Sequence, residues 1–240
     1  MKKIFNIILL ALFCTSCAQG QGGKLTQDPA PQGVVVRTSS EKVQKGTFEF
    51  TYEGQTLKYE VADGNEAKVS KKKSAKISGD VKIPENVTFA GEKYSVTTIG
   101  KKAFFYCDTL TSVSIPNSVT TIGTEAFGNC RGLTSITIPN SVTTIEASAF
   151  WGCEGLTNVF LPNSVETIEA SAFGSCENLK SIDVAKDNSH YSSENGVLFD
   201  ISKKTLIQYP CGIKGKYVIP NSVTTIGEGA FMYSGITDEI

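Results

Sequence analysis

Residues 110–122 read LTSVSIPNSVTTI, and nearly the same letters return at 133–145 as LTSITIPNSVTTI and at 156–168 as LTNVFLPNSVETI. Each copy is followed by an Ala-Phe pair and then by a cysteine, at Cys130, Cys153 and Cys176. The period is 23 residues. A unit of this length is too short to bury its own apolar face, so neighbouring units must stack and share a core. The repeats therefore predict a solenoid.

Within one unit, Leu110, Val113 and Ile115 alternate with small polar residues and predict a strand whose apolar side chains point inward. The following Pro-Asn-Ser predicts a turn, and a second extended piece is expected around Ile122. The segment 125–130 is interpreted as a short helical turn on the convex side. Neighbouring strands are expected to pair in parallel along one face, about 4.8 Å apart. The predicted fold class is a β-rich α/β solenoid.

Two gaps between repeats are longer than 23 residues and predict inserted hairpins. The first insertion spans Phe89–Tyr94, with Gly91 in the turn. The second contains apolar strands at 197–199 and 206–209 around a polar turn, and predicts a larger, protruding hairpin. Further upstream, alternating apolar residues from Phe48 to Val61 flank a Glu-Gly-Gln turn. They predict an N-terminal β-hairpin cap (47–80) that covers the open end of the repeats (81–240).

The N-terminus predicts export. Lys2 and Lys3 precede a short apolar run, which is typical of a secretory signal (1–16). The following Thr-Ser-Cys-Ala resembles a bacterial lipobox and predicts lipidation of Cys17, which would anchor the chain to a membrane. A Gly-, Gln- and Pro-rich stretch (17–46) is interpreted as a flexible tether.

The repeat resembles the bacterial BspA-like leucine-rich repeat, in the pattern LxxVxIPxSVxxIxxxAFxxC. The segment from Tyr191 to Asp200 is similar to that family's longer repeat. The resemblance implies a non-enzymatic cell-envelope lipoprotein, often linked to adhesion to host proteins or other cells. The chain is thus expected in the outer membrane and exposed at the surface. Because Cys17 is followed by no acidic residue before Asp28, a periplasmic position with a structural or assembly role remains the alternative.

Charge and composition limit the possible partners. The chain has 23 basic and 24 acidic residues, which argues against nucleic acid. The expected partner, given the repetitive surface and the resemblance, is a protein or glycan. We expect no cofactor, no metal and no catalytic residues. The single histidine, His190, is interpreted as an exposed loop residue. Glu146 and Glu169 share a column on an open edge, where their charges are expected to be solvated.

One cysteine per coil, at Cys107, Cys130, Cys153 and Cys176, predicts a ladder. We interpret it as structural because the last unit has Ser234 at the same position, which a required disulfide would not tolerate. Zinc is disfavoured because a straight column spreads the thiols too far for tetrahedral coordination. Cys211 is left over in this scheme.

Candidate partner-binding residues break the Ser/Thr background on the outward side of the strands. Phe160 is the main one, because large rigid side chains favour interfaces. The alternatives are an ordinary exposed aromatic residue, or one covered by the nearby hairpin. Trp151 is expected to pack over Gly128 and Gly174. The complete predicted set comprises Asn158, Phe160, Lys180, Asp183 and Val218.

The last residues, 236–240, begin another repeat without a capping element. They predict either end-to-end self-association or a shortened member of the family.

Overall fold

The computed structural model describes residues 46–72 and 77–236. The predicted signal peptide (1–16), Cys17, nearly all of the predicted tether (17–46) and the last four residues lie outside this range. The predictions made for them remain predictions.

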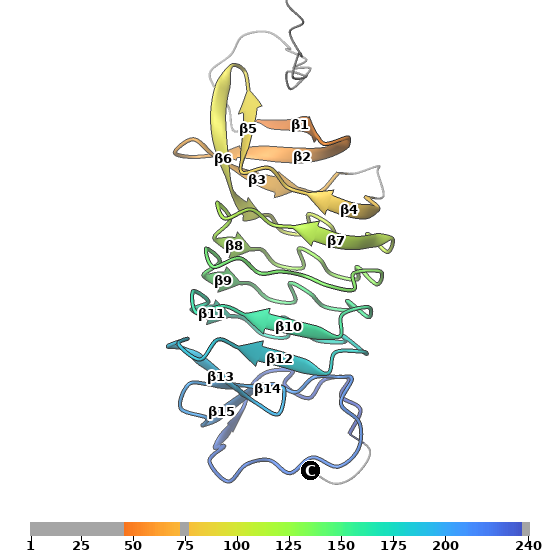
Figure 1. Ribbon diagram of the computed structural model, residues 1–240, viewed down its shortest axis with the longest axis vertical. Helices are drawn as coiled ribbons and strands as arrows, with labels where there is room; N and C mark the ends of the chain where they lie inside the picture. Colours follow the sequence, from red (N-terminus) through yellow and green to blue (C-terminus); the bar gives the residue numbers. More distant parts are fainter. Residues whose placement is uncertain (1–45, 73–76, 237–240) are drawn as a thin grey trace, which may run out of the picture. The chain divides into compact units, whose positions relative to one another are not determined.

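The predicted N-terminal hairpin is confirmed and is extended by a third strand. Strands β1 (Thr47–Tyr52) and β2 (Gln55–Ala62) pair antiparallel, and the turn uses positive φ angles at Glu53 and Gly54. Strand β3 (Glu66–Ser70) pairs antiparallel with β2 and parallel with β6 (Glu92–Ile99). Because β6 belongs to the first coil, this sheet covers that coil's open side (Figure 1). The insertion is also a hairpin, formed by β5 (Asn86–Phe89) and β6.

A parallel ladder of very short strands holds one side of the coils together. It continues from β6 through three two-residue Thr-Ile strands, with each Ile paired to the Ile of the next coil. Figure 1 shows these strands one above another. They are β8 (Thr121–Ile122), β9 (Thr144–Ile145) and β11 (Thr167–Ile168).

The expected continuous sheet on the other side is interrupted. Strand β4 (Gly79–Lys82) pairs in parallel with β7 (Leu110–Ser114), and β10 (Asn158–Leu161) pairs with β12 (Ser181–Val184). The intervening segment 134–138 is not a strand. Thr134 N still donates to Thr111 O at 3.2 Å, and Ile136 and Ile138 stay buried. Core packing thus keeps this coil in place where the ladder is broken.

The predicted short helical turns are wrong, since the described residues contain no helix. The segment 123–130 is a series of tight turns with positive φ at Glu125 (52°) and Asn129 (57°). A residue in the left-handed region interrupts a right-handed helix. Phe127 N donates to Ala149 O of the next coil at 2.8 Å. These turns therefore use their amides to join coils, and the fold is a β-and-turn repeat.

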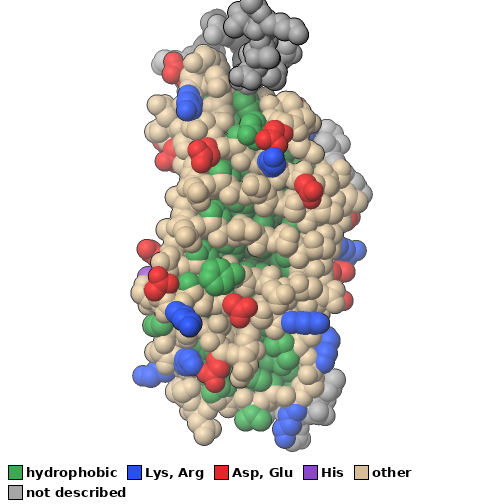
Figure 2. All heavy atoms as spheres, viewed as in Figure 1, with side chains coloured by type: hydrophobic (Ala, Val, Ile, Leu, Met, Phe, Trp, Pro, Cys, Tyr) green, Lys and Arg blue, Asp and Glu red, His purple; other side chains and the backbone are tan. Residues whose placement is uncertain are grey.

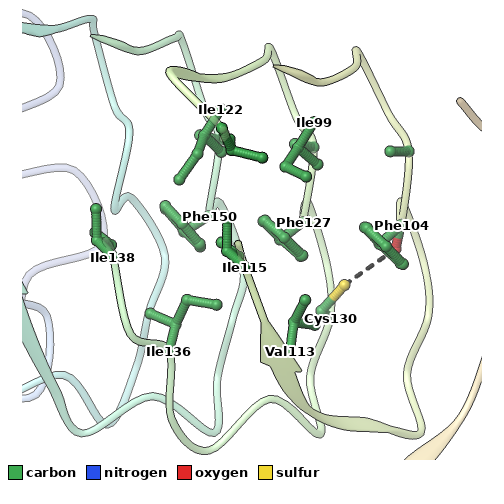
Figure 3. Packing of buried hydrophobic residues seen from close by; sticks show 14 of the residues in the cluster. Ile99, Phe104, Val113, Ile115, Ile122, Phe127, Cys130, Ile136, Ile138 and Phe150 are labelled. Atoms are coloured by element: carbon green, nitrogen blue, oxygen red, sulfur yellow. Dashed lines mark hydrogen bonds between the residues drawn. The ribbon is translucent and has the colours of Figure 1, made fainter. Parts of the chain in front are cut away.

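Stacked side chains form the core between the two strand layers. The rings of Phe104, Phe127, Phe150 and Phe173 follow one another at 5.1–5.4 Å with interplanar angles of 2–5°. Figure 3 shows the rings of Phe104, Phe127 and Phe150 in line, with Ile99 and Ile122 on one side and Val113 and Ile136 on the other. All these side chains are buried. The shared interior predicted from the repeats is confirmed.

The second insertion belongs to the core and does not protrude. Val197, Phe199 and Leu206 are buried. Leu206 aligns with Ile226 of the last coil in a parallel pair. The strands pair in the order β13 (Tyr191–Glu194), β14 (Val197–Asp200), β15 (Thr205–Gln208) and β16 (Thr225–Ile226).

Candidate functional site

The outward side chains of β10 and β12 bring together three of the five predicted partner-binding residues, Asn158, Phe160 and Asp183, and Lys180 lies directly before β12. The register places Asn158 beside Ser181 and Phe160 beside Asp183. Asn158, Phe160 and Asp183 are exposed, because strand side chains alternate and Val159, Leu161 and Ile182 take the inward positions. Lys180, which precedes β12, is also exposed. We call these four residues the β10–β12 surface.

Polar contacts organise this surface. Ser181 Oγ lies 2.9 Å from both Asn158 Oδ1 and Asp183 Oδ2, so two acceptors compete for its proton. Among the described residues, neither Lys180 nor Asp183 forms an ion pair. Their charges remain available to a partner.

Phe160 is the apolar centre of the surface. Its side chain is 56% exposed, so the described part of the nearby hairpin does not cover it. Figure 2 shows this face of the molecule as mostly uncharged, with scattered charges and hydrophobic groups among polar side chains. An exposed aromatic ring next to hydrogen-bonding groups is suited to contact a partner.

Val218 does not join this surface. It is 72% exposed, but it follows β15, and the β13–β14 hairpin contacts β12 where the next coil would otherwise lie. The Ile182 amide donates to Gly196 O at 2.9 Å within this contact. The predicted site is therefore divided by the insertion.

The two glutamates on the turn side have a structural role that the sequence analysis did not predict. Glu146 Oε2 accepts hydrogen bonds from Thr124 N at 2.8 Å and Thr124 Oγ1 at 2.7 Å. Glu169 Oε2 accepts one from Ala147 N at 2.9 Å. Each carboxylate thus provides a hydrogen-bond acceptor for a main-chain amide in the turn of the preceding coil.

The cysteine ladder forms as predicted, and three of its four thiols donate to main-chain carbonyls. Cys130, Cys153 and Cys176 donate to the carbonyl oxygens of Phe104, Phe127 and Phe150 at 3.0–3.2 Å. Figure 3 shows the first of these bonds. Burial raises the pKa of Cys130 and Cys176 to about 12 and holds the pKa of Cys153 well above its usual value. Thiols that stay protonated at neutral pH are poor nucleophiles and poor metal ligands.

Cys211 also belongs to this ladder, although the sequence analysis left it over. It is buried, it lies close enough to Cys176 for its charge to affect the pKa of that thiol, and Sγ donates to Met232 O at 3.5 Å. The missed signal was spacing, because Cys211 precedes Ser234 by one period of 23 residues.

Trp151 packs only partly as predicted. A Cβ added to Gly174 would lie 2.6 Å from the indole ring, so only glycine fits beneath it. Phe105 covers Gly128 instead. The other neighbour of Trp151 is Tyr233, with ring centroids 5.5 Å apart.

His190 is exposed, as predicted, but its neighbour Asn188 is the more informative residue. Asn188 is 3% exposed and donates to Pro162 O and Val165 O at 2.9 and 3.0 Å. Its Oδ1 accepts from the amides of His190 and Tyr191, both at 2.8 Å. This side chain fixes the start of the second insertion. One asparagine in a polar stretch gave no signal of that role.

No cluster of residues suited to a metal ion occurs in the described ranges. Within the same ranges, no helix is long and apolar enough to cross a membrane.

Comparisons with known proteins agree with the geometry. Residues 97–237 match the model of the BspA type leucine-rich repeat region in six copies. The pneumococcal vaccine antigen PcpA is similar in structure, with a TM-score of 0.54 and 20% identity over 77% of this chain and 62% of that one. A leucine-rich repeat protein from Eubacterium ventriosum is similar with a TM-score of 0.51 and 23% identity, over 80% of this chain and 60% of that one. This chain thus spans less than two thirds of either protein. The comparison with curated proteins gives no match. With more than half of its residues in the matched region, the chain belongs to the BspA type leucine-rich repeat family.

Proposed function

We propose that this protein is a non-enzymatic, lipid-anchored envelope protein that binds a protein or glycan through the β10–β12 surface. The single observation that carries the proposal is Phe160, an aromatic ring 56% exposed in a column otherwise occupied by Ser114, Thr137 and Asp183. The regular coils bury most of their large apolar side chains, so this exposed ring is not needed for the core. It is available for an interface.

The chemistry of the surface favours a partner with both apolar and polar groups. The ring supplies contact area, while Asn158 and Ser181 offer hydrogen-bonding groups beside it. Lys180 and Asp183 carry opposite charges, so the surface as a whole does not select strongly for one sign. A protein loop or a sugar face, each with apolar and hydroxylated parts, fits this arrangement.

Capture experiments test the surface. The purified chain is immobilised and exposed to host matrix proteins, to a glycan panel and to neighbouring bacterial cells, and the same experiment is repeated with Phe160→Ala. Thr137→Ala is the matched control because Thr137 occupies the same column one coil earlier. Loss of capture with Phe160→Ala alone supports the proposal. Equal capture by both variants rules out the β10–β12 surface.

Two further experiments test the anchor and its orientation. Cys17→Ser should move the protein from the membrane fraction to the soluble fraction, because the lipid attachment point is lost. Protease treatment of intact cells should degrade the protein if it faces outward. Protection until lysis would favour the periplasmic alternative.

A further inference from the structure

A cleft of about 250 Å³ opens where the second insertion breaks the repeat. The segment 168–173 lines one side, and Gly227 and Glu228 line the other, with Ile207 and Gln208 between them. Only two residues separate Leu206 from Tyr209, whereas four separate Ile122 from Phe127 in a regular coil. The coil that follows β11 is therefore too short to cover the segment 169–172.

Two identical sequences lie on either side of a coil boundary and differ in their hydrogen bonds. Residues 144–150 and 167–173 both read TIEASAF. In the first copy, Ala147 N donates to Glu169 Oε2, and Ser148 N and Phe150 N donate to carbonyl oxygens of the next coil. Among the residues that the structure describes, the corresponding amides of Ala170, Ser171 and Phe173 have no hydrogen-bond partner.

These amides face the cleft because the two copies have the same conformation. Ser148 and Ser171 both have φ of 56°. The rings of Phe150 and Phe173 are stacked 5.4 Å apart, with an interplanar angle of 2°. The amides of the second copy therefore point to where a further coil would lie, and the cleft occupies that place. Phe173 is buried, and a buried amide without an acceptor costs free energy.

The preceding coils indicate which acceptor fits. Thr124 N donates a hydrogen bond to the carboxylate of Glu146, and Ala147 N donates one to the carboxylate of Glu169. After β11, the equivalent positions hold Ile207 and then Gly227, since Leu206 pairs with Ile226, and neither residue offers a carboxylate. Successive amides beside a residue with positive φ form a concavity that favours anions, and hydrogen bonds to a carboxylate are stronger than those to neutral acceptors. We propose that this cleft binds a carboxylate group at the amides of Ala170 and Ser171.

The carboxylate can come from a small molecule or from an acidic side chain of an extended peptide. Only a peptide also brings a carbonyl oxygen for the Phe173 amide, as Ala172 does for Phe150. The carboxylate of Glu169 is directed to the preceding coil. Glu228 lines the cleft, and its charge opposes an anion. Glu228→Gln therefore strengthens binding.

The test is an amide NMR titration of the full chain with sodium acetate and, separately, with the blocked heptapeptide TIEASAF. We expect saturable shifts at Ala170 and Ser171 with both probes, and at Phe173 with the peptide. Ala147 and Ser148 serve as internal controls and should not shift. A peptide with alanine in place of glutamate should bind at least about tenfold more weakly, because a charged hydrogen bond is lost.

Gly227→Glu is the matched variant, because it supplies from the chain itself the carboxylate that Glu146 and Glu169 supply in earlier coils. It should abolish the response of Ala170 to acetate. Glu228→Gln, at an exposed position, provides a second test with little risk to folding. No saturable shift at Ala170, equal shifts at Ala147, or unchanged affinity in Glu228→Gln would each overturn the proposal. None of these outcomes depends on Phe160, so this site and the β10–β12 surface are tested separately.

Discussion

The regular coils and the region after Ala185 bury similar side chains but join them differently. Between Phe104 and Phe173 the rings are nearly parallel. After the second insertion, the Tyr209 ring is tilted by 32° against Phe231 and by 55° against Tyr217. The second region also forms a separate small cluster of buried residues. When the period is constant, equivalent residues of successive coils stack directly on one another. When the length of a coil changes, equivalent residues no longer align.

The joint between the two regions depends on particular polar contacts. Asn188 ties the insertion to the preceding coil through four hydrogen bonds. The hydroxyl of Tyr191 accepts from Ile168 N at 2.8 Å, on the side of β11 away from β9. Where the regular repeat ends, hydrogen bonds from single side chains join the segments, whereas main-chain hydrogen bonds between short strands join the regular coils. The amides of Ala170, Ser171 and Phe173 remain unpaired, and these residues line the cleft.

Core truncation should show the largest difference between the two regions. Phe127→Ala removes a buried ring from the middle of the column and should lower the free energy of unfolding by about 3–5 kcal/mol. Phe231→Ala, at a half-buried ring, should cost about 1–2 kcal/mol. Urea denaturation followed by circular dichroism measures both. Equal losses would contradict the contrast in packing.

Removal of the Asn188 side chain should have the next largest effect. Asn188→Ala leaves buried backbone groups without partners and should cost about 2–3 kcal/mol. Asn178→Ala is the control, because Asn178 is exposed and makes one hydrogen bond, to Glu154 O; it should cost less than about 1 kcal/mol. If both variants unfold at the same urea concentration, Asn188 does not secure the joint.

The buried thiols of the regular coils should make the protein sensitive to alkali. The folded pKa of Cys130 and Cys176 is raised from 9.0 to about 12, so their contribution to stability is complete below pH 9 and is lost as the pH rises toward 12. Between neutral pH and pH 10, the contribution of each thiol to the free energy of unfolding should fall by about 1.4 kcal/mol.

Urea melts at pH 7 and pH 10 test this effect. The variant Cys130→Ala should show a weaker pH dependence than the unmodified protein, whatever its stability at pH 7. An unchanged pH dependence would show that this thiol does not titrate as proposed.

The smallest effect concerns association. Ile226, Met232 and Tyr233 are exposed in the last coil that the structure describes, and we propose weak end-to-end contacts there. Sedimentation at increasing concentration should show self-association that Ile226→Lys reduces, with Val218→Lys as the comparison. A monomer at every concentration would refute this proposal.

The period was sufficient to predict the stacked core from the sequence. The columns of Phe127, Cys130 and Ile122 recur at the same step, so their burial followed from repetition alone. Helical turns were wrongly expected because the sequence does not show that Glu125 and Asn129 adopt positive φ. That conformation is stabilised by hydrogen bonds between coils, which depend on the assembled stack.

The candidate surface was predictable only in its regular part. Phe160 and Asp183 were placed correctly because they share a strand register. Val218 is exposed, but the β13–β14 hairpin separates it from these residues. The sequence did not show this separation, because the insertion was expected to protrude. The cleft could not be predicted from the sequence of one repeat. Residues 144–150 and 167–173 are identical, and only the coil that follows each of them in the stack differs.

The most direct test of the account is the unfolding of a variant that lacks one whole repeat. Removal of residues 134–156 takes out 23 residues and joins Leu133 to Thr157, which has the position of Thr134 in its own repeat. Stacked, interchangeable coils predict a folded protein that unfolds cooperatively in urea, with lower stability than the full chain. Removal of residues 134–145 alone, which breaks the period, should abolish folding. An unfolded protein after loss of the complete repeat, or a folded one after loss of the partial repeat, would contradict the account.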